Sequence, residues 1–200
     1  MLLICDEVAT GFGRTGTLFA CEQEEVVPDF LCLAKGLTGG YLPLAATLTT
    51  DAVYESFLGP FESKRTFFHG HSYTGNPLAC AAALASLRLF DEDLTLDHAR
   101  AMGERLAEGL ASVSELKHVG DVRQRGLIIG IELVKDRKTK EEFSYPDRMG
   151  HKVALAARGR EVMLRPLGNV VVLMPPLSIK PSEVDFLVDG VRESIREATE

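Results

Sequence analysis

Two short apolar runs, each followed at once by polar residues, most constrain how this chain can fold. The first run, residues 2–5, ends at Asp6, and the second, residues 30–33, ends just before Lys35. Continuous apolar runs of this length are typical of strands that are covered on both faces in a parallel sheet. Because ligands of open α/β sheets collect at the carboxyl ends of the strands, Asp6 and Lys35 are the first candidates for chemistry.

Helical patterns follow from residue 76. Asn76 is placed to cap a helix that has Pro77 at its first position and continues through an alanine-rich stretch over 78–90. Apolar residues at spacings of three and four then predict an amphipathic helix over 96–113. The further elements that we expect are a strand over 127–134, a helix over 147–158, two strands around the turn 166–169 and a closing helix that starts at Ser182 with a weak capping box.

This alternation of strands and helices predicts an α/β protein with two blocks that separate near residue 95. We expect residues 1–95 to form one domain on a parallel sheet, and residues 96–200 to form a small carboxy-terminal α/β domain.

The composition excludes several classes of function. An apolar share of 46% with 26% charged residues is ordinary for a globular protein with a buried core. The net charge of −7 and the scattered basic residues argue against a nucleic-acid partner. No apolar run approaches the roughly 20 residues that cross a bilayer, so no membrane partner is expected. The first residues lack the basic and apolar regions of a signal peptide, which predicts a cytoplasmic location.

Neither a metal site nor a disulfide framework is expected. The 4 cysteines lie far apart in the sequence, with no C-x-x-C pair. His69 and His71 lie close together, yet the sequence places no third ligand near them, so the pair does not predict a metal centre.

Asp6 and Lys35 form the kind of pair that chemistry on a pyridine ring needs. A lysine after a buried strand can be partly desolvated, which makes its neutral amine available to attack an aldehyde. An aspartate opposite a pyridine nitrogen keeps that nitrogen protonated and makes the ring an electron sink. Two other interpretations stay open: Lys35 as a solvated lysine at a strand end, and Asp6 as an acceptor for backbone amides of the glycine-rich turn 10–16.

The residues around this pair resemble a known signature. Residues 6–16, the dipeptide Pro28-Asp29 and residues 33–40 are similar to those of the class III (ω-amino acid) aminotransferases of fold type I. The resemblance implies an enzyme with pyridoxal 5′-phosphate as its cofactor, a small-molecule amino donor, an oxo-acid acceptor and a homodimeric assembly. It also implies that the first domain is part of the cofactor-binding large domain.

Carried over by position, four residues resemble cofactor contacts of that family. Asp6 matches the partner of the pyridinium nitrogen. Lys35 matches the lysine that forms the Schiff base and also meets the substrate. His71 and Ser72 match the pair that reaches the cofactor phosphate of the neighbouring subunit. Threonine is frequent where Ser72 stands, and either hydroxyl can donate to a phosphate oxygen.

Two further positions resemble substrate contacts. Gly70 matches a substrate-contacting backbone position, and Arg165 matches the arginine that holds the carboxylate of the oxo acid, a task that its planar fork suits. Other segments are similar to the branch of the class that acts in biotin biosynthesis. They are residues 44–50, 69–80, 164–166 and 173–176.

Two departures from the family pattern leave alternatives open. Members of that branch that use S-adenosylmethionine as donor often have a tyrosine on the strand after the substrate arginine, whereas residues 170–173 are all aliphatic. The donor is therefore S-adenosylmethionine or lysine. The chain begins at the strand that bears Asp6, so we expect a carboxy-terminal half without the family's amino-terminal part.

The other hypotheses are a class III aminotransferase of ornithine or 4-aminobutyrate type, and a non-catalytic truncated fragment.

Overall fold

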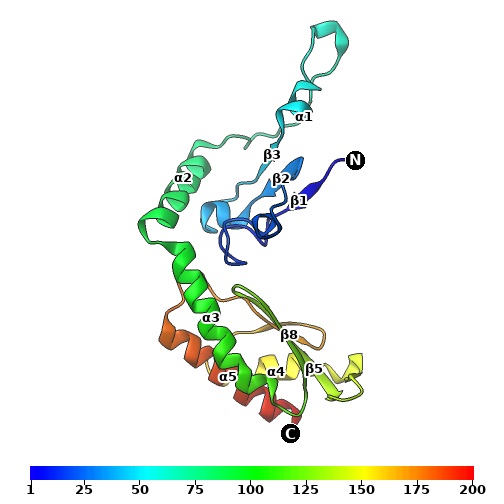
Figure 1. Cartoon of the computed structure of the whole chain (residues 1–200), viewed down its shortest axis with the longest axis vertical. Helices are drawn as coiled ribbons and strands as arrows, with labels where there is room; N and C mark the ends of the chain where they lie inside the picture. The colour runs from blue at the N-terminus through cyan, green and yellow to red at the C-terminus, as the bar shows by residue number, and fades with distance from the viewer. The chain divides into compact units, whose positions relative to one another are not determined.

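The computed structural model describes residues 1–200, which divide into two compact units. Unit 1 is Met1–Leu96 and unit 2 is Asp97–Glu200. Strands and helices occur in both units (Figure 1), so the predicted α/β class is confirmed. None of the helices combines the length and the apolar character needed to cross a bilayer.

The sheet of unit 1 has three strands in the order β1-β2-β3. They are β1 (Ile4–Asp6), β2 (Phe30–Leu33) and β3 (Ala46–Thr49). β1 and β2 run parallel, with Asp6 opposite Cys32. β3 runs antiparallel to β2, because the chain reverses after β2 through Gly39 and Gly40, which have φ angles of 60° and 83°. The sheet is therefore parallel only between β1 and β2.

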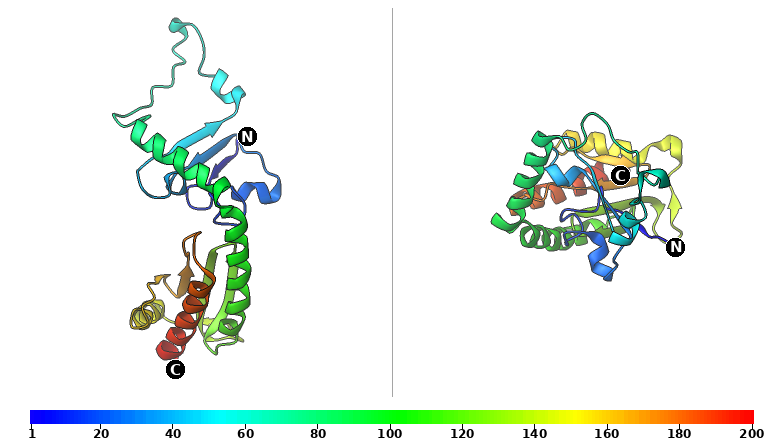
Figure 2. Two further views of the ribbon diagram at one scale, coloured as in Figure 1. Left: turned by 90° about the vertical axis from the view of Figure 1, so that its left-hand side faces the viewer. Right: turned by 90° about the horizontal axis from the view of Figure 1, so that it is seen from above.

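A long helix packs beside this sheet. α2 (Pro77–Glu92) begins after Asn76, whose side chain accepts hydrogen bonds from the first N–H groups of the helix, the shorter of them at 3.0 Å. This is the cap that the sequence predicted. α2 runs alongside the three strands (Figure 2). The buried residues that the helix shares with the rest of unit 1 are Phe12, Leu33, Leu37 and Ala83.

The remaining helices of unit 1 are short. They are η1 (Ala20–Glu24), η2 (Lys35–Thr38), α1 (Asp51–Glu55) and η3 (Phe61–Ser63). The segment over residues 51–75, which we call the aromatic arm, extends away from the sheet (Figure 1). Its exposed rings are Tyr54, Phe57, Phe61, Phe67, Phe68 and Tyr73.

β1 is not covered on both faces, so this prediction was wrong. Leu2, Leu3 and Ile4 are exposed by 60%, 47% and 63%. β1 lies at the edge of its sheet and pairs only with β2. An apolar run indicates what a strand needs to bury, but it does not supply the elements that would cover the strand.

Unit 2 is built on a five-stranded antiparallel sheet with the order β4-β5-β8-β7, in which β6 also pairs with β5. Its strands are β4 (Val119–Arg125), β5 (Ile128–Asp136), β6 (Glu141–Glu142), β7 (Arg165–Leu167) and β8 (Val170–Leu173). Its helices are α3 (Thr95–Ser114), which begins in the last residues of unit 1, η4 (Tyr145–Asp147), α4 (Met149–Arg158) and α5 (Pro181–Thr199). All the elements predicted for this part of the chain are present, whereas β4 was not predicted.

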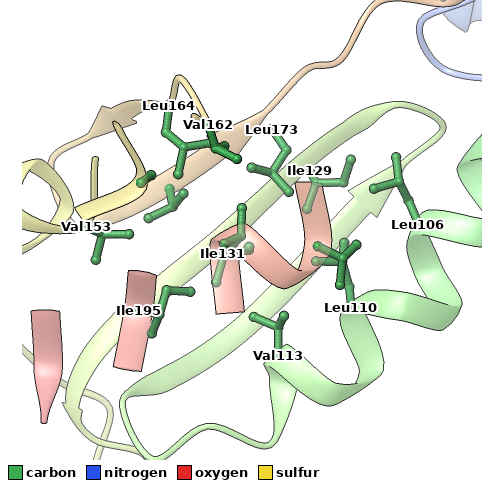
Figure 3. Packing of buried hydrophobic residues seen from close by; sticks show 14 of the residues in the cluster. Leu106, Leu110, Val113, Ile129, Ile131, Val153, Val162, Leu164, Leu173 and Ile195 are labelled. Atoms are coloured by element: carbon green, nitrogen blue, oxygen red, sulfur yellow. The ribbon is translucent and has the colours of Figure 1, made fainter. Parts of the chain in front are cut away.

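The core of unit 2 lies between its sheet and its helices. Leu106, Leu110 and Val113 on α3 cluster with Ile129 and Ile131 on β5 (Figure 3), and each of the five is 2% exposed or less. Burying a side chain of this size contributes roughly 1.5–3 kcal/mol. The spacing of three and four on α3 thus predicted the buried face of the helix.

The start of α5 differs from the prediction. The helix begins at Pro181, one residue before Ser182. Glu183 Oε2 accepts a hydrogen bond from the N–H of Lys180 at 2.8 Å, so the bond that anchors the first turn involves Lys180 and not Ser182. Proline at the first helical position loses no hydrogen bond, since that N–H has no partner in a helix, and it allows the earlier start.

Candidate active site

Asp6 and Lys35 lie at the same end of the strands in the unit 1 sheet. Asp6 is the last residue of β1 and stands opposite Cys32 of β2. β2 ends at Leu33, and Lys35 opens η2 two residues later. Because β1 and β2 run parallel, Asp6 and Lys35 mark the carboxyl ends of neighbouring strands, where ligand sites of α/β sheets form.

Asp6 keeps one carboxylate oxygen free of the chain. Its Oδ1 accepts a hydrogen bond from the N–H of Val8 at 3.0 Å, while Oδ2 makes no hydrogen bond within the chain and the residue is exposed. The bond to Val8 lies ahead of the turn 10–16. Asp6 therefore does not hold the amides of that turn, which was its alternative interpretation.

The glycine-rich turn is held by Glu7, a residue that was not predicted to belong to the site. Glu7 is 3% exposed. Its carboxylate accepts hydrogen bonds from the hydroxyl of Thr10 and from the N–H of Cys21 at 2.8 Å. Its backbone carbonyl accepts a third bond, from the N–H of Gly11 at 2.9 Å. No local pattern predicts this role, because Cys21 lies 14 residues further along the chain.

The same contacts set the charge of Glu7. Burial acts to raise the pKa of its carboxyl group, but hydrogen bonds from Thr10, Cys21 and Ala20 outweigh burial and hold the pKa below its ordinary value of 4.5. For the Cys21 thiol, burial and then the hydrogen bond to Glu7 raise the pKa. Glu7 is therefore a carboxylate at neutral pH, and it directly follows Asp6 in the chain.

Lys35 has an unusual backbone and a free side chain. Its φ angle of 47° lies in the left-handed region, which few residues other than glycine adopt. The residue is exposed, and its amine forms no ion pair within the chain. The sequence predicted partial desolvation, and for this chain that prediction was wrong, because Lys35 itself is exposed although β2 ends in the buried Leu33.

Gly36 allows the glycine-rich turn to pack against the residue that follows Lys35. A Cβ built on Gly36 would lie 2.7 Å from the Cβ of Phe12, which is itself 3% exposed. Any larger residue would push Phe12 away. The signature segments 6–16 and 33–40 are therefore in direct contact.

His71 and Ser72 lie on a turn at the end of the aromatic arm. The N–H of Tyr73 donates to Nδ1 of the His71 ring at 3.1 Å. Since Nδ1 acts as an acceptor, the ring proton lies on Nε2, which can donate to a ligand. Ser72 and the preceding Gly70 are exposed. The turn thus offers an imidazole N–H and a hydroxyl close together in the sequence.

Arg165 belongs to unit 2. It is the first residue of β7 and stands opposite Val172 of β8. Its side chain is exposed and forms no ion pair within the chain, so the guanidinium is available to bind a carboxylate.

The structure contains no group of three or more His, Cys, Asp or Glu side chains placed to hold a metal ion. The ring of His69 stacks on that of Phe67, with centroids 5.5 Å apart.

Comparison with known proteins gives one family over nearly the whole chain. A model of the family "Aminotransferase class-III" matches residues 1–195. The adenosylmethionine-8-amino-7-oxononanoate aminotransferase of Nitratidesulfovibrio vulgaris is 59% identical over 200 residues, which are 100% of this chain and 37% of that relative. The protein of the same name from Geobacter sulfurreducens is 55% identical over 199 residues, which are 100% of this chain and 44% of that relative.

Solved structures give the same result. The adenosylmethionine-8-amino-7-oxononanoate aminotransferase of Methanocaldococcus jannaschii has a TM-score of 0.95 and 50% identity, and the match covers 98% of this chain and 46% of that one. An (S)-enantioselective ω-transaminase from Thermomicrobium roseum has a TM-score of 0.93 and 38% identity, and the match covers 100% of this chain and 44% of that one. The chain spans less than half the length of these relatives.

Proposed function

This chain belongs to the class III aminotransferases, and from this premise we propose that it forms part of an enzyme that converts 8-amino-7-oxononanoate to 7,8-diaminononanoate in biotin biosynthesis. The observation that carries the proposal is the 59% identity, over the whole chain, to a relative named for the first of these compounds. The fold type I class expected from the sequence is confirmed by the TM-score of 0.95.

The proposal concerns a larger protein than the chain by itself, because the chain spans 37% and 44% of the two relatives described above. We refer to this chain joined to the part of its relatives' length that it does not span as the restored protein. In our proposal the restored protein acts in the cytoplasm and supplies the strands that cover and extend the β1 edge of the unit 1 sheet.

The residues of unit 1 fit pyridoxal 5′-phosphate, the cofactor of class III aminotransferases. The free oxygen of Asp6 suits a protonated ring nitrogen, and the exposed amine of Lys35 suits covalent attachment. Nε2 of His71 and the hydroxyl of Ser72 suit a phosphate group. When bound, the cofactor supplies an aldehyde for amines and a ring that withdraws electrons from the substrate carbon.

Each residue of the site then has one task. With the cofactor and the amino donor bound, Nζ of Lys35 would take a proton from the donor carbon as general base and return it as general acid. The carboxylate of Asp6 would hold the ring nitrogen and stabilise a positive charge on it. The guanidinium of Arg165 would bind the carboxylate of the oxo acid, which its planar fork suits, and Gly70 would offer its backbone to the substrate.

We propose that the restored protein is a homodimer. The aromatic arm leaves large rings in solvent, with Phe61 exposed by 94% and Phe68 by 91%. Apolar surface of this kind is typical of interaction sites. The arm ends in the turn that bears His71 and Ser72. Docking of the arm onto a second subunit would bring this turn to the cofactor of that subunit.

The test of the proposal compares two lysines. Lys35 and Lys64 are both exposed, and both have left-handed backbones, with φ angles of 47° and 52°. In the restored protein, borohydride reduction should fix the cofactor to Lys35, and peptide mass spectrometry should locate it there. Lys35→Ala should lose both this attachment and turnover of 8-amino-7-oxononanoate, whereas Lys64→Ala should keep both. Attachment that survives Lys35→Ala would contradict the proposal.

Substrate profiling separates the remaining functions. Turnover of ornithine or 4-aminobutyrate without turnover of 8-amino-7-oxononanoate would favour a different class III aminotransferase. Absence of any turnover in a restored protein that binds the cofactor would contradict the enzymatic proposal and favour a non-catalytic role for this chain. Supplying S-adenosylmethionine and lysine separately identifies the amino donor.

A further inference from the structure

The turn that carries His71 and Ser72 is closed by two hydrogen bonds between His71 and Thr74. The N–H of His71 donates to the hydroxyl oxygen Oγ1 of Thr74 at 3.0 Å. In return, the N–H of Thr74 donates to the carbonyl of His71 at 3.0 Å. Ser72 lies inside the small ring that these two hydrogen bonds form, and its backbone is therefore fixed on both sides.

The closed turn is also tied to α2. The N–H of Asn76 donates to the carbonyl of Tyr73 at 3.2 Å. The side chain of Asn76 in turn caps α2, accepting from the N–H of Leu78 at 3.0 Å. Asn76 therefore links the turn by hydrogen bonds to the first residues of a 16-residue helix.

The orientation of the His71 ring depends on the same turn. Its Nδ1 accepts from the N–H of Tyr73 at 3.1 Å, and Tyr73 is the residue directly before Thr74. If the turn opened, the ring would lose this donor, and with it the preference for the tautomer that carries the proton on Nε2.

We propose that Thr74 is a positioning residue for phosphate binding. Its hydroxyl holds the His71–Thr74 turn closed. In the closed turn, Nε2 of His71 and the hydroxyl of Ser72 are already oriented to donate to the phosphate group of the cofactor when it binds. The inference rests on the proposed function, because it assumes that His71 and Ser72 contact this phosphate. Preorganised donors bind more tightly because less side-chain and backbone freedom is lost on binding.

The experiment uses the apo form of the restored protein and two cofactor forms that differ only in the phosphate. Dissociation constants for pyridoxal 5′-phosphate and for pyridoxal are measured by absorbance titration, a readout that does not depend on turnover. Thr74→Val keeps the shape of the side chain but removes the acceptor, whereas Thr74→Ser keeps the acceptor. Losing one hydrogen bond of this kind should weaken binding of pyridoxal 5′-phosphate about three- to tenfold in Thr74→Val.

Binding of pyridoxal should be unchanged in Thr74→Val, and Thr74→Ser should bind both compounds as the unmodified protein does. Equal weakening for both compounds, or no weakening for either, would overturn the proposal. If Thr74→Val does not fold, Thr74→Ala replaces it, with thermal unfolding as the check.

Ser72→Ala separates this inference from the proposed function. If Ser72→Ala weakens pyridoxal 5′-phosphate but not pyridoxal, while Thr74→Val changes neither, the positioning role of Thr74 fails and the phosphate contact stands. If neither variant distinguishes the two compounds, the phosphate contact fails, and the role of Thr74 fails with it.

Discussion

Gly150 lies against the backbone of Gly168 more closely than any other residue type would permit. A Cβ built on Gly150 would lie 2.3 Å from the carbonyl oxygen of Gly168 and 2.8 Å from the Cβ of Pro166. Gly150 is the second residue of α4, and Gly168 lies in the turn between β7 and β8. This contact fixes the hairpin whose first residue is Arg165.

Gly150→Ala should therefore displace the hairpin. We expect a loss of about 1–3 kcal/mol in the free energy of unfolding, the usual effect of overpacking, measured by urea denaturation. In the restored protein, the KM for the oxo acid should rise as Arg165 moves. Gly159→Ala is the matched control, because the nearest atom to its Cβ is the Ala156 carbonyl oxygen at 3.4 Å. If Gly150→Ala and Gly159→Ala change the free energy of unfolding and the KM by the same amounts, the contact between Gly150 and Gly168 does not fix the hairpin.

Glu7 should make the stability of the chain depend on pH. Its folded-state pKa lies below the ordinary value of 4.5, so its charged form stabilises the fold above that value, and this contribution is lost as the pH falls through the folded pKa. Glu7→Gln should cost about 1–3 kcal/mol at pH 7, since Thr10 and Cys21 lose a charged acceptor that is itself buried. In urea denaturation, the gap between the two proteins should shrink toward acid pH. Glu22→Gln, at an exposed site of the same segment, should change nothing.

Asp6→Asn tests the charge opposite the ring nitrogen. In the restored protein we expect the cofactor still to attach to Lys35, while transamination slows by orders of magnitude, because a neutral amide no longer stabilises the protonated ring. The hydrogen bond from Val8 can be kept by the amide oxygen, so folding should be little changed. Stopped-flow absorbance of each half-reaction provides the measurement. Near-normal rates would make Asp6 a structural residue.

Arg165→Ala separates substrate binding from chemistry. The KM for the oxo acid should rise strongly, because a bidentate pair that loses one partner in a desolvated site costs about 2–5 kcal/mol. The half-reaction with a donor that does not use this contact should keep its rate. Arg165→Lys should restore only part of the affinity, since an ammonium group cannot reproduce the fork. An equal decline of both half-reactions would argue that Arg165 supports the fold.

The parts of the fold that follow from local pattern could be predicted from the sequence. The cap at Asn76, the buried face of α3 and the strand end before Lys35 each depend on neighbours within one or two turns of chain. β4 could not be predicted, because its inward positions after Val119 are Gly120, Val122 and Gln124, and only one of these carries an apolar side chain. The roles of Glu7 and Gly150 depend on partners 14 and 18 residues away, at Cys21 and Gly168, and no periodicity reports such contacts.

Of the candidate site, too, only the part that depends on local pattern could be predicted from the sequence. The position of Asp6 and Lys35 at one sheet edge follows from two apolar runs and the parallel pairing of their strands. The tasks of Gly70, His71, Ser72 and Arg165 rest on resemblance and stay predictions. Physical signals for them are weak in the sequence, because exposed polar residues on turns and strand ends occur in most proteins.

The left-handed backbone at Lys35 has a consequence for how this position evolves. A residue other than glycine at such a φ angle destabilises the fold by on the order of 1 kcal/mol. Lys35, with its φ angle of 47°, carries this strain and is also the residue proposed to hold the cofactor. Selection for folding alone would favour glycine here, so Lys35→Gly should raise the melting temperature of the chain relative to Lys35→Ala while abolishing catalysis. Stability and activity therefore compete at a single residue, and a drift of position 35 to glycine in a descendant would mark the loss of selection for catalysis.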